Sequence, residues 1–289
     1  MRRGAAADRF AKGIVLAYLA LALVPIVWML VTSFKRNADA TSLVPKFVPF
    51  GDAAVSFKPT LENYATVLGG AAGSTGTPFS RNLASSLVIG AGSTLLAVVL
   101  ATLAAYGFSR FPMKGKKDWL FFILSTRMLP PLAVVIPIFL MFSRLGLTDT
   151  HLGLILLYAA FSLSLGVWLM KGFIDEIPRE YEEAALVDGY TRLEAFRRVI
   201  LPQAATGIAT TAVFCLISAW NEFAFALILN ASGATPVPVF IQGQLGDVRG
   251  VPWGELAAGA LLFVLPVVAF TFLVRRHLLR GVTFGAIKR

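Results

Sequence analysis

Six long apolar stretches constrain this chain more than any other feature. An α-helix needs roughly 20 predominantly apolar residues to cross a hydrocarbon layer about 30 Å thick. Hydrophobic residues make up 57% of the sequence and charged residues 15%, whereas soluble domains carry about 25% charged residues. We therefore predict an all-α membrane protein with six transmembrane helices. The stretches that meet the length are Ile14–Phe34, Leu83–Phe108, Trp119–Met141, Leu152–Met170, Ala204–Leu229 and Leu256–Val274.

The first stretch has features of a secretory signal peptide, because Arg2 and Arg3 precede it. Its 21 residues exceed the apolar core of such a peptide, and Lys35-Arg36 intervenes before the small residues at 38–40. We interpret it as a retained transmembrane helix.

The distribution of basic residues predicts the orientation, because Lys and Arg concentrate in cytoplasmic segments. With the N-terminus inside, the cytoplasmic segments hold 18 Lys and Arg residues and the outer segments seven. Both termini are therefore expected to be cytoplasmic. The formal net charge of +10 then reflects topology, and we expect no nucleic acid partner. The predicted cytoplasmic segments are 1–13, 109–118, 171–203 and 275–289.

A long outer segment, 35–82, separates the first helix, 14–34, from the other five and is rich in Pro, Gly, Ser and Thr. This spacing predicts a peripheral first helix and a five-helix core over 83–274, followed by a C-terminal tail, 275–289. In the outer segment after the fifth span, residues 236–246 could form a short helix that dips into the membrane.

The inner loop 171–203 is predicted to form two short helices joined by a turn. Pro178 suits a first helical turn, and the acidic residues that follow it complement the helix dipole. The first helix should end at Asp188-Gly189, where the glycine can adopt the left-handed conformation. Thr191 and Glu194 then have the spacing of a capping box.

This loop resembles the EAA loop of ABC-transporter permeases, with Val199 where the family has Ile. The resemblance implies a type I ABC importer permease fold, in which a short cytoplasmic coupling helix docks on an ATPase subunit. That contact couples nucleotide-driven closure to movement of the membrane helices. The alternative is an amphipathic surface helix with ordinary caps. The coupling residues implied are Glu183, Ala184, Ala185, Asp188, Gly189, Leu201 and Pro202.

Segments along nearly the whole chain are similar to the second permease subunit of maltose-type carbohydrate importers, and residues 125–131 with the tail most resemble polyol (mannitol or sorbitol) permeases. The resemblance implies a multi-pass protein of the bacterial cytoplasmic (inner) membrane that imports a sugar or polyol. Its implied partners are a second permease subunit, two ATPase subunits, an extracytoplasmic solute-binding protein and membrane lipid. The similar segments include 25–28, 33–35, 61–64, 105–111, 220–223 and 280–288.

The chain has no G-x-x-x-x-G-K-[ST] loop, so we expect it to bind no cofactor and to be no enzyme. ATP and Mg²⁺ would bind to the partner ATPase. An intramembrane hydrolase lacks support, because no His lies within a predicted span and no G-x-S-x-G motif occurs. Two alternatives stay open: an ion-coupled secondary transporter and an ABC permease for a non-carbohydrate solute.

Two ionisable residues, Arg127 and Glu222, lie at depth within predicted spans. A charge at mid-membrane costs about 2.5–3.5 kcal/mol, so each should face protein or a wet cavity, and a salt bridge between them is one hypothesis. Trp220 and Asn221 add an aromatic face and an amide beside Glu222, which suits a sugar. These four residues are candidates for the substrate pathway, although Asn221 and Glu222 could instead form hydrogen bonds between helices, or with the partner subunit, and not contact the substrate. Pro130-Pro131 predicts a kink.

Overall fold

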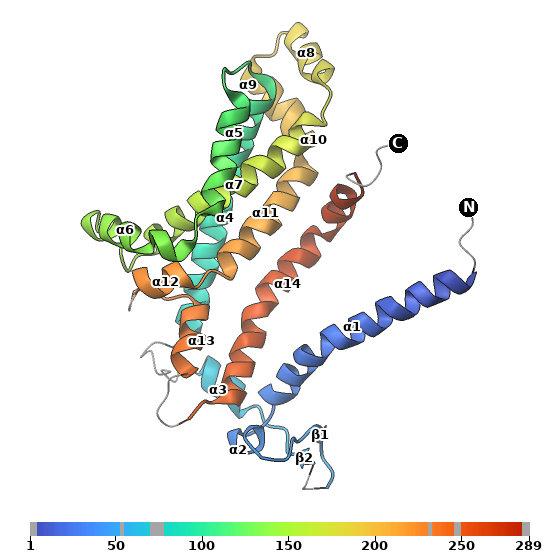
Figure 1. Cartoon of the computed structure of the whole chain (residues 1–289), viewed down its shortest axis with the longest axis vertical. Helices are drawn as coiled ribbons and strands as arrows, with labels where there is room; N and C mark the ends of the chain where they lie inside the picture. Colours follow the sequence, from blue (N-terminus) through green and yellow to red (C-terminus); the bar gives the residue numbers. More distant parts are fainter. Residues whose placement is uncertain (1–4, 53–54, 70–77, 231–232, 246–249, 285–289) are drawn as a thin grey trace. The chain divides into compact units, whose positions relative to one another are not determined.

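The structure is a computed structural model, which describes residues 5–52, 55–69, 78–230, 233–245 and 250–284. Most of its regular structure is helical, as the composition predicts (Figure 1). The chain forms two compact units, one from Met1–Ser80 and Phe240–Val264, the other from Arg81–Val239 and Leu265–Arg289.

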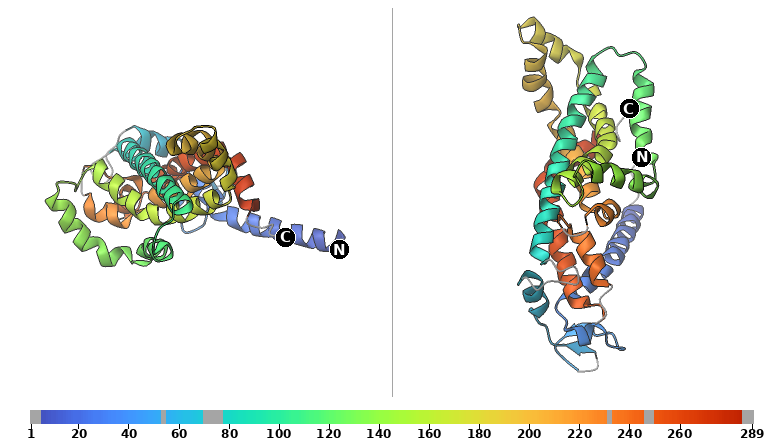
Figure 2. Two further views of the ribbon diagram at one scale, coloured as in Figure 1. Left: turned by 90° about the horizontal axis from the view of Figure 1, so that it is seen from above. Right: turned by 90° about the vertical axis from the view of Figure 1, so that its left-hand side faces the viewer.

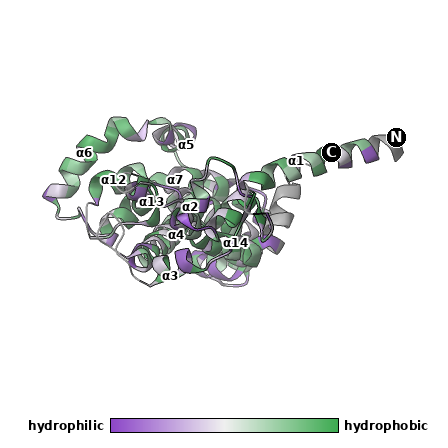
Figure 3. Ribbon diagram, turned by 90° about the horizontal axis from the view of Figure 1, so that it is seen from below, coloured by the Kyte–Doolittle hydropathy of each residue, from purple (hydrophilic) through white to green (hydrophobic). Residues whose placement is uncertain are grey.

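In the part of the chain that the structure describes, four helices are long and apolar enough to cross a membrane. They are α1 (Ala5–Ser33), α4 (Phe79–Arg110), α7 (His151–Asp175) and α14 (Trp253–Phe284). Two bent helix pairs bring the number of candidate spans to six if each pair is one span. The first pair joins Lys116–Met128 to Pro131–Arg144 at 94°, and the second joins Arg192–Gln203 to Ala205–Trp220 at 73°. Apolar residues cover much of α1 and of α6, which is Pro131–Arg144 (Figure 3).

The third predicted span is not one continuous helix. It consists of α5 (Lys116–Ser125), a 3₁₀ turn at Thr126–Met128 and α6 (Pro131–Arg144). Leu129 and Pro130 are extended, with ψ of 124° and 127°. The α conformation is unfavourable for a residue that precedes a proline, because the proline ring clashes with it. Proline also lacks the N–H that would continue the helix. The predicted kink at the two prolines is therefore confirmed, and it is a full break.

The fifth predicted span is also interrupted. Helix α11 (Ala205–Trp220) ends one residue before Asn221, and α12 begins separately at Ala224 and ends at Leu229. Beyond it, α13 (Val237–Leu245) forms the short helix expected over 236–246.

The first unit joins the end of α1 to short elements. These are α2 (Asn37–Ala40), the parallel strands β1 (Val48–Pro49) and β2 (Ser56–Phe57), and α3 (Glu62–Leu68). The Asn63 amide donates to the carbonyls of Ser33 and Lys35 at 2.7 and 2.8 Å, which ties α3 to the end of α1. Burial lowers the pKa of the Lys35 ammonium, which lies 4.0 Å from the Trp28 ring centroid.

The second unit is built on α4, α7 and α11, which meet through small residues. Ala97, Ala101 and Ala105 of α4 are fully buried. A methyl group on Gly166 of α7 would come within 2.9 Å of the Ala101 Cβ atom, so the helix backbones lie close together there. Small residues at such a contact permit close helix packing in membranes. The loop helices α8 (Arg179–Val187) and α9 (Arg192–Ala195) lie beyond one end of these helices (Figures 1 and 2).

This packing predicts opposite effects for two glycines of α7. Gly166→Ala should lower the stability of the complex by about 1–3 kcal/mol, because the added methyl group overpacks the contact with Ala101. Gly172 has no atom within 4 Å of an added Cβ, so Gly172→Ala should raise stability by up to about 1 kcal/mol through helix propensity. Thermal unfolding of the purified complex would show this, and shifts of the same sign would contradict the packing argument.

Candidate functional site

The loop helix α8 has the ends that the sequence predicts. It begins after Pro178, carries two glutamates in its first turn and ends at Val187, with Asp188 as its C-cap. Gly189 adopts φ +89°, which confirms the predicted left-handed turn. Thr191 and Glu194 form the predicted capping box at the start of α9.

The two faces of α8 differ in burial. Glu182 and Ala185 are 4% and 5% exposed and face their own chain. Glu183, Ala184, Val187, Asp188 and Gly189 are exposed. The motif residues therefore lie on two faces of the helix. Ala185 packs against its own chain, whereas the acidic side chain of Glu183 and the small side chain of Ala184 are accessible to another protein.

The second half of the loop contains a π-helical stretch that no pattern in the sequence predicted. It covers Phe196–Ile200 and passes into a short helical segment, Leu201–Gln203. Pro202 cannot donate a backbone hydrogen bond to Arg198, which interrupts the α-helical ladder at this point. Leu201 is half-buried and Pro202 is exposed.

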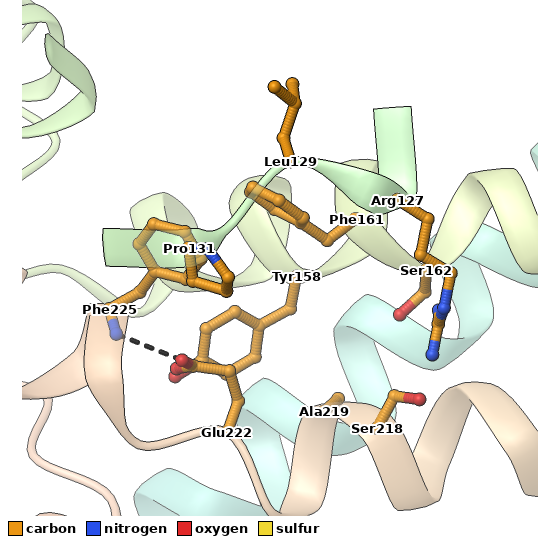
Figure 4. Close-up of a pocket in the computed structure, with 10 residues that line it drawn as sticks. All are labelled: Arg127, Leu129, Pro131, Tyr158, Phe161, Ser162, Ser218, Ala219, Glu222 and Phe225. Carbon is orange, nitrogen blue, oxygen red and sulfur yellow. Dashed lines mark hydrogen bonds between the residues drawn. The ribbon is translucent and has the colours of Figure 1, made fainter. Parts of the chain in front are cut away.

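A second candidate site is a cavity of about 230 Å³ in the second unit, lined by residues from the break in the third predicted span and from the interruption after Trp220 (Figure 4). The break at Leu129-Pro130 supplies one part of the lining, the segment around the end of α11 supplies a second, and α7 supplies a third. The lining combines aromatic rings, hydroxyls and two charged groups, a mixture that can hold a polar solute with apolar faces. The lining residues are Arg127, Leu129, Pro131, Tyr158, Phe161, Ser162, Ser218, Ala219, Glu222 and Phe225.

Glu222 acts as a cap in this cavity. Its carboxylate accepts hydrogen bonds from the backbone N–H groups of Phe225 and Ala226, at 3.0 and 3.3 Å. These donors belong to the first turn of α12, which would otherwise lack partners. The Tyr158 ring lies beside this carboxylate (Figure 4).

The hypothesised salt bridge between Arg127 and Glu222 is absent from the structure. Both side chains line the cavity, but the ion pairs within 4.0 Å in the described part of the chain do not include them. The carboxylate is instead held by backbone donors, so the exposed guanidinium of Arg127 keeps its charge available to the cavity.

Two of the sequence-based candidates lie outside the cavity lining. Trp220 is 5% exposed, and its ring lies 3.1 Å from where a Cβ on Gly90 would be, so it packs against α4. Asn221 is exposed, and its amide donates to the Ile217 carbonyl at 2.8 Å. The Trp220 ring, the Asn221 amide and the Glu222 carboxylate therefore do not form one site, because only Glu222 lines the cavity. The aromatic residues of the cavity are Tyr158 and Phe161, three residues apart on α7, with Phe225.

Comparison with known proteins gives one family and a consistent set of relatives. Residues 93–284 match the family described as "Binding-protein-dependent transport system inner membrane component". The trehalose transport system permease protein SugB of Mycobacterium tuberculosis is 35% identical over 92% of this chain and 93% of its own length. The trehalose/maltose transport system permease protein MalG of Thermococcus litoralis is 33% identical over 93% and 92%.

A similar fold occurs in a solved structure. A chain of a bacterial ABC transporter that imports the acidic polysaccharide alginate superposes with a TM-score of 0.75. The alignment covers 96% of this chain and 99% of that chain at 23% identity, which supports the fold.

The cavity geometry predicts that Arg127 and Glu222 act independently on stability. Arg127→Gln and Glu222→Gln should have effects that add within about 0.5 kcal/mol in the double variant, because no ion pair joins the two residues. Glu222→Ala should cost about 1 kcal/mol, since it removes the cap of α12. A coupling energy well above that range, measured by thermal unfolding of the complex, would contradict this geometry.

Proposed function

The chain belongs to the family of binding-protein-dependent transport system inner membrane components, and we propose that it is one of two permease subunits in an ATP-driven carbohydrate importer. It is a multi-pass permease of the cytoplasmic membrane, a transport component rather than an enzyme. The observation that carries the carbohydrate assignment is identity of 33–35% to trehalose and trehalose/maltose permeases over more than nine-tenths of this chain.

In this proposal both termini and the loop 171–203 lie on the cytoplasmic side, in accord with the excess of basic residues there. Two ATPase subunits bind ATP and Mg²⁺ on that side. A solute-binding protein delivers substrate on the opposite side, which the family's description supports by making transport dependent on such a protein.

The exposed face of α8 supplies the contact with an ATPase subunit. Ala184 has a minimal side chain, so a partner surface can approach the helix closely there, and Glu183 offers a free carboxylate to a basic group on the partner. The turn at Gly189 fixes where this face ends. Movement of the ATPase subunits would thereby reach the membrane helices through the loop.

The cavity between the helix breaks is this subunit's part of the translocation pathway. Arg127 and Glu222 offer hydrogen-bonding groups to hydroxyls, and the rings of Tyr158, Phe161 and Phe225 offer faces for the C–H surface of a sugar. A disaccharide or a polyol would suit these groups. Trp220 and Asn221 lie where the fifth predicted span is interrupted and do not line the translocation pathway.

A panel of solutes tests the proposed substrate class. The complete transporter in vesicles, with its binding protein, should take up trehalose, maltose, mannitol or sorbitol only when ATP is supplied. Uptake driven by a proton or sodium gradient without ATP would contradict the mechanism. ATP-dependent uptake of amino acids but of no sugar or polyol would contradict the carbohydrate assignment.

A pair of substitutions at Gly189 tests the coupling loop. Gly189→Val should abolish assembly with the ATPase subunits or uncouple ATP hydrolysis from transport, because a β-branched residue is strained at φ +89°. The Cβ of a new residue would meet no atom within 4 Å, so backbone conformation and not crowding decides the outcome. Gly189→Asn is the matched control, since Asn tolerates positive φ, and it should retain more coupling than the Val variant. Equal coupling in both variants, measured as transport per ATP hydrolysed, would reject the role of the turn.

A further inference from the structure

We infer that Glu182, Arg110 and Tyr106 are positioning residues that fasten the coupling helix α8 to the membrane helix α4. This inference rests on the proposed contact between α8 and an ATPase subunit. It adds a route by which a force that the ATPase subunit exerts on α8 moves α4 and α7 together as one rigid body.

The centre of this fastening is a buried carboxylate. Glu182 is 4% exposed, and its Oε1 accepts a hydrogen bond from the Tyr106 hydroxyl at 2.5 Å. Its Oε2 lies 3.1 Å from Nε of Arg110, and both side chains of this ion pair are 5% exposed. A charge removed from water needs such compensation, so the partners define one position for the first turn of α8.

Arg110 also reaches the end of a third helix. Its Nη2 donates to the carbonyls of Ile174 and Ile177, at 3.1 and 2.8 Å. Carbonyls at the C-terminal end of α7 have no partner within the helix, and a cation there interacts favourably with the helix dipole. One guanidinium on α4 therefore holds both the end of α7 and the start of α8.

Further contacts extend this cluster to α7 and to the second half of the loop. Arg179, the first residue of α8, donates to the Ser109 carbonyl at 3.0 Å. The Ser109 hydroxyl in turn donates to Asp175 Oδ1 at 2.6 Å. The Tyr106 ring packs on Phe196 with the ring centroids 4.6 Å apart, so the π-helical stretch of the loop is joined to the same cluster.

The neighbouring carboxylate provides a natural comparison. Glu183 is exposed, whereas Glu182 is buried among the groups just described. Successive residues on an α-helix point about 100° apart, so the two acids face different surroundings. Glu182 serves the attachment of α8 to its own chain, and Glu183 serves the proposed contact with the ATPase subunit.

Distances between spin labels on the two helices test the inference in the complete transporter. Labels would be placed at Leu103 on α4 and Glu180 on α8, both exposed, with Cys215 and the partners' cysteines replaced. The unmodified cluster should give one narrow distance distribution, unchanged between nucleotide-free and vanadate-trapped states. In Glu182→Gln the distribution should broaden by about 5 Å, the rise of one helical turn. Tyr106→Phe should broaden it less.

Matched controls separate this inference from the proposed function. Glu183→Gln should leave the narrow distribution intact and weaken retention of the ATPase subunits, whereas Glu182→Gln should broaden it. A second label pair within α4, at Leu95 and Leu103, should not change in any variant if the helix is folded. If Glu182→Gln yields no complex, Tyr106→Phe decides by the same criterion.

Two results would overturn the inference. One is a distance distribution that stays narrow in Glu182→Gln, or in Tyr106→Phe where that variant replaces it. The other is a change of about 5 Å in the distance between α4 and α8 on vanadate trapping when the cluster is unmodified. Failure of the ATPase subunits to copurify with the unmodified permease would instead overturn the proposed function.

Discussion

The architecture depends on the need to pair every backbone polar group that enters hydrocarbon. Continuous helices meet this need within themselves, and α1, α4, α7 and α14 are long enough to do so. Within the described residues, the chain departs from this solution before Pro130 and after Trp220, where both interruptions line one cavity, and at the 73° bend between Gln203 and Ala205. Irregular backbone at membrane depth is tolerated where it is buried in protein or lines such a cavity. Glu222 satisfies two of the freed donors, so a charged residue there is structural as well as accessible.

Local signals of high specificity anticipated much of the structure. The apolar stretches located the spans, the two prolines located the break in the third, and Gly189 with Thr191 and Glu194 located the turn and cap of the loop. Each of these features depends on residues close together in the chain, so sequence reasoning could reach it. The break after Trp220 was missed because no proline or glycine marks it.

Features that depend on contacts between distant segments escaped prediction. The spacing of Trp220, Asn221 and Glu222 suggested one site, but consecutive residues at a helix end point in different directions, and only Glu222 lines the cavity. Tyr158 joins the site from a different helix. Glu182 and Arg110 are 72 positions apart, and the sequence offers no sign that one buried pair joins them.

The two adjacent acids of α8 have a consequence for how this loop can change. The letters of the family motif include the exposed acid, Glu183, and leave out the buried one, Glu182. Insertion or deletion of one residue between Pro178 and Glu182 would turn both acids by about 100° relative to the start of the helix. The buried partner groups would then meet a different side chain, although every motif letter remained in place. The number of residues in this turn is thus a constraint as strict as their identity, and motif matching by letters alone would not detect its violation.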